Sequence, residues 1–121
     1  MSADQVAEIS PLIREVMSDT EGTGNGLCAT FEVEGNVAAW AQVTKSEFNV
    51  TYPLSKPPAE ELLEVNRALP SAELLSWQPD KFATWSFVSS EPRVVAKVVD
   101  QALAHLFGLG DYSVNGQLVR L

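Results

Sequence analysis

The sequence predicts one α+β domain over residues 1–121, with a mainly antiparallel sheet that carries helices on one face. Three stretches of the chain, at residues 27–34, 37–43 and 47–52, alternate between apolar and polar side chains, as half-buried strands do. Other stretches repeat apolar residues at helical spacing. Strand runs separated by single helices favour helices packed on one side of a sheet, here in the order α-βββ-α-ββ-α plus a short C-terminal β-like tail.

The first helix is predicted within residues 4–17, which repeat apolar side chains at helical spacing. Ser10-Pro11 interrupts this pattern. Proline suits the first position of a helix, so the firm helix should run from Pro11 to Met17 with Ser10 as its cap. Residues 19–26 have the composition of a loop.

Three strands should follow as an antiparallel meander. In the first strand, alternate residues such as Leu27 and Phe31 should point to one face of the sheet. The residues Glu34-Gly35-Asn36 should form the turn to the second strand. Trp40 lies on the face opposite the second strand's apolar residues. The inward residues expected in the third strand are Phe48, Val50 and Tyr52.

A second helix should begin after the prolines of residues 53–58 and end before Pro70. It should bury Leu62, Val65 and Leu69. A hairpin is predicted next, with strands at residues 73–77 and 82–88 around the turn Gln78-Pro79-Asp80-Lys81.

The last helix has the clearest apolar stripe, running from Val94 to Phe107. Ser89 or Ser90 could cap it, and Gly108 should close it with a left-handed residue. Beyond it, residues 112–121 contain Asn115-Gly116, which suggests a short terminal hairpin or an added edge strand.

The segment Leu62-Leu63-Glu64-Val65-Asn66-Arg67 is similar to the Leu-x-x-x-Asn segment of the middle helix in the type III secretion chaperone-like fold. With the amphipathic last helix, Arg93 to Phe107, the acidic balance and the element order, the chain resembles this group over most of its length. The group includes dimeric secretion chaperones and the YbjN-like family, named for bacterial sensory transduction regulation. The resemblance implies protein binding and a homodimer. The tail after Gly108 departs from the pattern.

The net charge of −8 argues against nucleic acid as a partner, because that affinity depends on clustered lysine and arginine. The acidic residues are concentrated in the first half: residues 1–64 hold 11 acids and 3 bases, and residues 65–121 hold 5 of each. This imbalance serves solubility, or it forms an acidic face for a basic partner. No run of residues is apolar enough for a membrane span.

A cytoplasmic location is expected from the N-terminal residues and the cysteine content. Asp4 and Glu8 precede any basic residue, unlike the start of a signal peptide, and Cys28 is the only cysteine, so it cannot form an intramolecular disulfide. Cys28 alternates with the core face of its strand, so it is expected to be a small sheet residue. A reactive thiol would need basic neighbours, which the nearby sequence does not offer.

No catalytic, metal or cofactor site is expected. His105 is the only histidine, and it should lie on the polar side of the last helix near its C-terminal end. Glu60, Glu61 and Glu64 are explained by the positive N-terminal end of their helix, without a metal. The glycines between Gly22 and Gly26 resemble a phosphate loop but precede a strand and include no lysine, which favours a simple connection.

The aromatic residues are the main candidates for binding a partner. If one face of the sheet is left uncovered, Trp40, Trp77 and Trp85 should be exposed on it, with Tyr52 and Phe48 as further candidates. Tryptophan often dominates the binding energy of an interface. The alternative is that these residues belong to the core of a sheet covered on both faces.

The favoured interpretation is a non-enzymatic, chaperone-like or regulatory protein-binding domain, homodimeric, with an exposed sheet face or groove. The competing interpretation is a small-molecule-binding or enzymatic domain. Its pocket would lie between sheet and helices, where polar groups such as Thr30, Glu32, Asn49 or Tyr52 would converge.

Overall fold

A computed structural model describes residues 2–18, 26–88, 91–110 and 112–120. It does not describe residues 19–25 of the predicted loop, the capping residues Ser89 and Ser90, or the side chains of Glu60 and Glu64. Along the chain the elements are α1 (Ser2–Ser18), β1 (Leu27–Val33), β2 (Asn36–Val43), β3 (Glu47–Tyr52), α2 (Pro58–Glu61), α3 (Leu63–Ala68), β4 (Glu73–Gln78), β5 (Lys81–Ser86), α4 (Pro92–Phe107) and β6 (Val114–Arg120).

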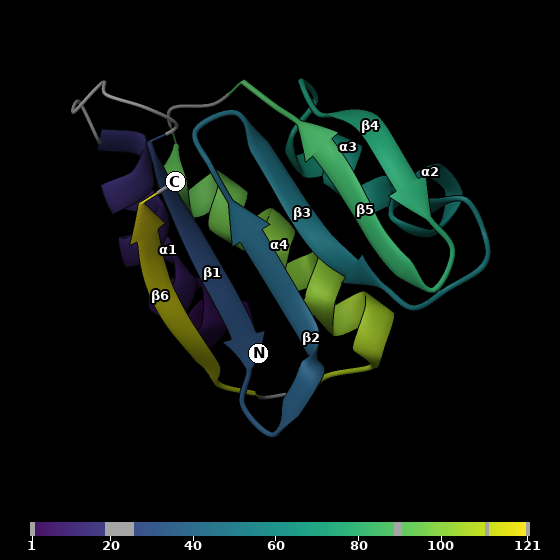
Figure 1. The fold of residues 1–121 in the computed structure, drawn as a ribbon, viewed down its shortest axis with the longest axis horizontal. Coiled ribbons are helices and arrows are strands. Elements are labelled where there is room, and N and C mark those ends of the chain that lie inside the picture. The colour runs from purple at the N-terminus through teal and green to yellow at the C-terminus, as the bar shows by residue number, and fades with distance from the viewer. Residues whose placement is uncertain (1, 19–25, 89–90, 111, 121) are drawn as a thin grey trace.

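The six strands form one antiparallel sheet in the order β4-β5-β3-β2-β1-β6. Helices α1 and α4 pack against each other and lie behind the sheet in the view of Figure 1, with α3 beside α4. The α+β class, the element order and the C-terminal strand predicted from the sequence are confirmed. We call the sheet face against α1 and α4 the inner face, and the opposite one the outer face.

The core lies between the inner face and the helices. Alternate residues of β1, β2, β3 and β5 point toward it, and the helices contribute residues three and four apart, because these repeats bring apolar side chains to one side of each element. Residues with less than 2% exposure include Phe31, Val43, Phe48, Tyr52, Trp85, Ile9, Ile13, Val95 and Leu103.

Helix α1 runs unbroken through Pro11, so the expectation that its firm part starts at Pro11 with Ser10 as the cap is wrong. Ser10 is buried, and its hydroxyl has no hydrogen-bond partner. Burial explains the longer helix: Ile9 and Ile13, on either side of the proline, both lie fully inside the core. Packing of an amphipathic face outweighs the poor helix propensity of one residue.

The predicted middle helix is divided into α2 and α3 at Leu62, whose φ of −116° and ψ of 48° are not helical. Leu62, Val65 and Leu69 are nevertheless buried as predicted. Helix α4 begins with Pro92 in its first turn and ends at Gly108, which has the expected left-handed φ of 62°. Asp80, in the turn between β4 and β5, also has a positive φ.

The C-terminal tail forms the edge strand β6, and the alternative of a terminal hairpin is wrong. All seven residues of β6 pair with β1 in unbroken register, from Val114 opposite Val33 to Arg120 opposite Leu27. Gly116 lies beneath α1, where an added Cβ would come within 2.3 Å of Leu12 Cδ1. Glycine therefore allows α1 to approach the strand closely.

Candidate binding face

The outer face is the candidate site, because within the described parts of the chain α1 and α4 both lie on the other side of the sheet (Figure 1). Its middle consists mostly of uncharged polar side chains with two aromatic rings among them. By strand alternation and pairing, its central residues are Thr30, Glu32, Trp40, Gln42, Asn49, Thr51, Phe82 and Thr84.

Trp40 is held at an irregular position in β2. Its cross-strand neighbour is Glu32, and the pairing of β1 with β2 shifts register immediately beyond, between Glu32 and Val33. On the other side, the Thr51 hydroxyl accepts a hydrogen bond from the Trp40 N–H at 3.1 Å and donates one to the Trp40 carbonyl at 3.2 Å. Such irregularities often occur where a side chain is directed toward a functional surface.

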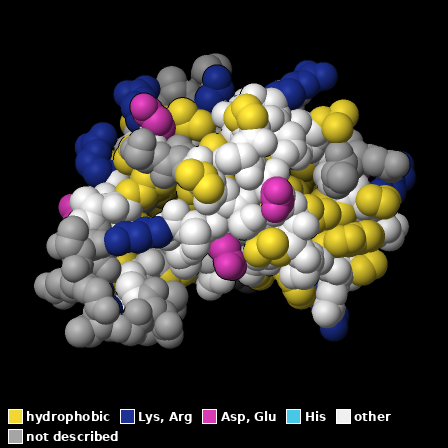
Figure 2. Space-filling view, turned by 90° about the horizontal axis from the view of Figure 1, so that it is seen from above, with side chains coloured by type: hydrophobic (Ala, Val, Ile, Leu, Met, Phe, Trp, Pro, Cys, Tyr) yellow, Lys and Arg dark blue, Asp and Glu magenta, His cyan; other side chains and the backbone are white. Residues whose placement is uncertain are grey.

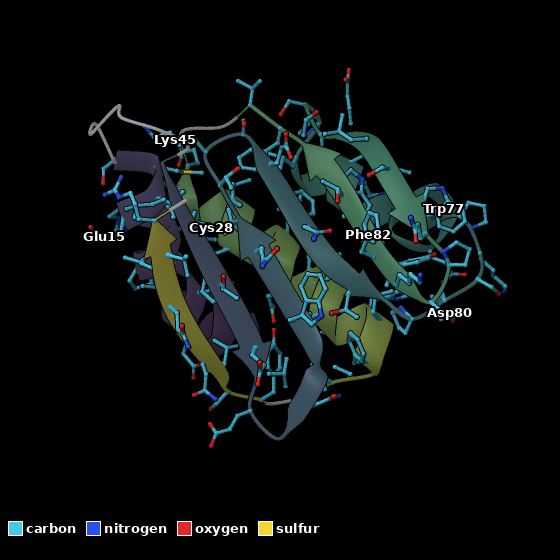
Figure 3. All side chains as sticks on the ribbon, viewed as in Figure 1. Glu15, Cys28, Lys45, Trp77, Asp80 and Phe82 are labelled. Atoms are coloured by element: carbon cyan, nitrogen blue, oxygen red, sulfur yellow. The ribbon has the colours of Figure 1, made fainter. Side chains whose placement is uncertain are left out.

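Phe82 is the second aromatic residue of the outer face. It pairs with Thr51 across β3 and β5, so Trp40, Thr51 and Phe82 lie in one row across three neighbouring strands. Both rings are partly exposed. Figure 3 labels Phe82 on β5 and Trp77 on the neighbouring edge strand. The sequence contained the signal for Phe82, because a residue three positions before inward Trp85 must face the opposite way.

The polar residues around these rings are partly paired with each other. The Thr84 hydroxyl donates to Asn49 Oδ1 at 2.8 Å across β5 and β3. A shallow hollow of about 590 Å³ lies where the outer face meets β6 and is lined by residues of β1 and β6, among them Thr30, Glu32 and Gln117. The outer face thus offers hydrogen-bonding groups, two rings and a depression.

The structure corrects the predicted binding residues. Trp85 is 1% exposed and stacks on Phe48, with the ring centroids 5.1 Å apart, so the expectation that Trp85 is exposed is wrong. Phe48 and Tyr52 are equally buried on the inner face, as their alternation indicated, and therefore cannot contact a partner. The cause is pairing: Trp85 lies directly opposite Phe48, and opposed residues share a face.

Trp77 lies on the inner side at the β4 edge, where its partly exposed ring meets Tyr52 edge-on at 5.9 Å. Of the five predicted residues, only Trp40 is on the outer face. The polar groups named for a pocket do not converge either. Thr30, Glu32 and Asn49 are on the outer face, and the Tyr52 hydroxyl is on the inner side, where it donates to the Lys56 carbonyl.

A buried polar pair was not predicted. Asp100 on α4 is 3% exposed, and its Oδ1 accepts a 2.6 Å hydrogen bond from the Tyr112 hydroxyl. Burial raises the pKa of Asp100. Burial, together with the bond to Asp100, also raises the pKa of Tyr112. The sequence feature that could have indicated this pair is an aspartate within the apolar stripe of the last helix, directly after the buried Val98 and Val99.

A smaller cavity of about 260 Å³ lies between the α2–α3 segment and α4. Its wall includes Leu62, Leu63 and Gln101, and its rim carries His105, whose Nε2 is 3.4 Å from Glu61 Oε2. His105 is exposed near the C-terminal end of α4, as predicted. Cys28 is a free, buried thiol.

Within the described ranges, no group of three or more histidine, cysteine, aspartate or glutamate residues is arranged to hold a metal ion. None of the described helices combines the length and apolar character needed to cross a membrane. Figure 2 shows hydrophobic side chains gathered toward the β4 end of the molecule and lysine and arginine at several separate places. Comparisons of the chain with protein-family models, curated proteins and solved structures found no match.

Proposed function

We propose that this chain is a non-enzymatic protein-binding domain whose outer sheet face receives a segment of another protein. The observation that carries the proposal is the row of Trp40, Thr51 and Phe82 on a sheet face that the described helices leave open. Half-exposed aromatic rings surrounded by hydrogen-bonding side chains are typical of binding hot spots.

The chemistry of the outer face suits an extended or helical peptide. Thr30, Gln42 and Asn49 can exchange hydrogen bonds with polar groups of such a segment, and Glu32 beside Trp40 favours a basic residue in it. The resemblance to the chaperone-like group supports the same kind of role. We assign this function to the cytoplasm, in keeping with the expectation from the sequence.

Selection from a displayed library of random peptides tests the proposal, with the purified domain as the immobilised target. We expect Trp40→Ala and Phe82→Ala each to weaken binding of the selected peptides at least about tenfold, because hot-spot aromatic residues contribute about 2 kcal/mol or more. The matched control is Trp77→Ala, which removes a partly exposed ring from the inner side and should leave binding unchanged.

Thermal unfolding separates lost binding from lost folding. Trp85→Ala should destabilise the domain by about 3–5 kcal/mol, because it empties a buried site, whereas Trp40→Ala should have a much smaller effect. Peptides that bind equally well to the wild type and to both outer-face variants would refute the proposal.

Small-molecule binding is the second candidate, and the cavity between the α2–α3 segment and α4 favours it. That cavity combines apolar walls with the Glu61–His105 pair at its rim. A thermal-shift screen of metabolites would support it if a compound stabilised the wild type but not Ala102→Trp, which fills the cavity. The shift should be independent of Trp40.

A further inference from the structure

Beyond Val114, the β6 edge of the sheet lacks the features that normally prevent strands from pairing. Soluble proteins protect edge strands with proline, charged residues or bulges. Strand β6 has no proline and no register shift, and Arg120 is its only charged residue. Leu118 and Val119 are 39% and 43% exposed. The opposite edge, β4, has a register shift between Leu74 and Ser76.

The outward backbone groups of β6 can be assigned from its contacts. The Glu34 N–H donates to the Ser113 carbonyl at 2.8 Å, so Ser113 directs its backbone groups toward β1. The backbone N–H and C=O groups of successive residues point in alternating directions along an antiparallel ladder. Val114, Gly116 and Leu118 therefore direct these groups away from the sheet. The Val114 N–H agrees, because it donates to Glu8 Oε2 of α1 at 3.0 Å instead of to β1.

We propose that β6 pairs with β6 of a second copy of this chain, antiparallel, about a two-fold axis at Gln117. Gln117 is the middle residue of the strand, so this register places each of the seven residues opposite a residue of the partner strand. The Val114 N–H already donates to Glu8 Oε2, so the backbone bonds of the junction come from Gly116 and Leu118. Gly116 then lies opposite the partner's Leu118, and both direct their backbone groups into the junction. The proposal is independent of the function proposed for Trp40 and the outer face.

Charge favours a second copy in this orientation. Strand β6 has the carboxylate of Glu8 at its Val114 end and Arg120 at its other end. An antiparallel pair brings Arg120 of each copy opposite Val114, and so near Glu8, of the other copy. Opposite charges therefore meet at both ends of the junction, whereas a parallel pair would bring like charges together. The two sheets join into one, with both outer faces on the same side.

Cysteine cross-linking tests the register. In a Cys28→Ser background, Gln117→Cys should form an intermolecular disulfide under mild oxidation. A directly opposed, non-hydrogen-bonded pair has a Cα separation of about 4.5 Å, which a disulfide can span. Val119→Cys in the same background is the control: it is on the same face, but its two copies would be about 14 Å apart. Equal cross-linking of both variants would overturn the proposal.

The mass in solution tests the interface itself. Sedimentation equilibrium of the full chain should give twice the chain mass of 13.1 kDa. Leu118→Lys should weaken association at least about tenfold, whereas Leu75→Lys, at a comparably exposed leucine on β4, should leave it unchanged. Circular dichroism establishes that each variant is folded. A monomeric wild type would overturn the proposal, as would a dimer that Leu118→Lys does not weaken.

Charge exchange adds a test that does not alter the strand's apolar residues. Arg120→Glu should weaken the dimer, and Arg120→Glu combined with Glu8→Lys should restore it. If the double variant is weaker than Arg120→Glu alone, the antiparallel register is wrong. If the chain stays monomeric and β6 pairs with a strand of a different protein, that strand is the occupant of the edge and the second copy is not.

Discussion

At the residue scale, Asp100 makes the stability of the domain depend on pH. Its pKa is raised in the folded chain by burial, so the folded state holds its proton at pH values where the unfolded chain has released it. Because the folded state then binds more protons, the free energy of unfolding must fall as pH rises above the ordinary value of 3.8 and through the raised pKa. Above the raised pKa the full cost of a buried carboxylate is present.

Asp100→Asn should flatten this dependence, because the amide does not titrate yet still accepts the hydrogen bond from Tyr112. We expect the variant to be at least as stable as the wild type at pH values above the raised pKa of Asp100. Tyr112→Phe should instead cost about 1–3 kcal/mol, since it leaves the buried Asp100 carboxyl without this hydrogen-bond partner. Urea unfolding at several pH values between about 4 and 7 gives the free energy of unfolding of the wild type and both variants. A steeper pH dependence in Asp100→Asn would contradict this account.

At the same scale, the alternation of side chains along a strand predicts which aromatic residues are buried. It assigns Phe48 and Tyr52 to the core, which the structure confirms, and the same rule assigns Phe82 to the face opposite Trp85. The sequence could not decide which of two opposite faces of the hairpin meets the helices. That choice depends on the pairing of β5 with β3, a contact between residues far apart in the chain.

At the element scale, the proline inside α1 should be a cost that the fold tolerates. Pro11 is exposed and has no N–H to bond the Ala7 carbonyl one turn earlier. Pro11→Ala should therefore raise the free energy of unfolding, by about 1–3 kcal/mol. Pro92→Ala is the control: Pro92 lies in the first turn of α4, where the N–H has no helical partner, so it should change little. Denaturant unfolding of both variants gives the comparison.

A loss of stability in Pro11→Ala would show that the ring shapes α1 to fit the core, and that the missing hydrogen bond is secondary. The same helix shows why its start could not be predicted from local signals. Ser10-Pro11 is a good helix beginning by itself, but Val6 and Ile9 before it are buried, and this packing extends the helix.

The periodicity of apolar residues predicted the elements that bury one clear face, such as α4 and β1. It failed where a contact with a distant part of the chain determines the local structure. The division of α2 from α3 at Leu62 has no sequence marker, since Leu62 keeps the buried position expected in a continuous helix. Asn115-Gly116 suggested a turn, but the close approach of Leu12 to Gly116 shows that glycine serves the packing of α1 on β6. Such reasons lie outside any short window of sequence.

At the scale of the whole molecule, helices on one side leave the sheet with two kinds of free surface. The outer face offers side chains, and the β6 edge offers backbone groups. These surfaces meet at the hollow lined by Thr30, Glu32 and Gln117, which borders the proposed junction. Pairing of two β6 strands would place two such hollows next to each other, so a bound segment could contact both copies.

Pairing through β6 predicts that thermal stability depends on protein concentration, because association stabilises the folded state by mass action. Each tenfold increase in concentration adds about 1.4 kcal/mol to unfolding of the dimer, which corresponds to a rise in Tm of roughly 2–4 °C for a unit of this size. At any given concentration the Tm of Leu118→Lys should be lower than that of the wild type, because its dimer is weaker, whereas Leu75→Lys should follow the wild type. Scanning calorimetry over a dilution series measures this slope. A wild-type Tm that stays constant on dilution would contradict pairing at this edge, whatever the outer face binds.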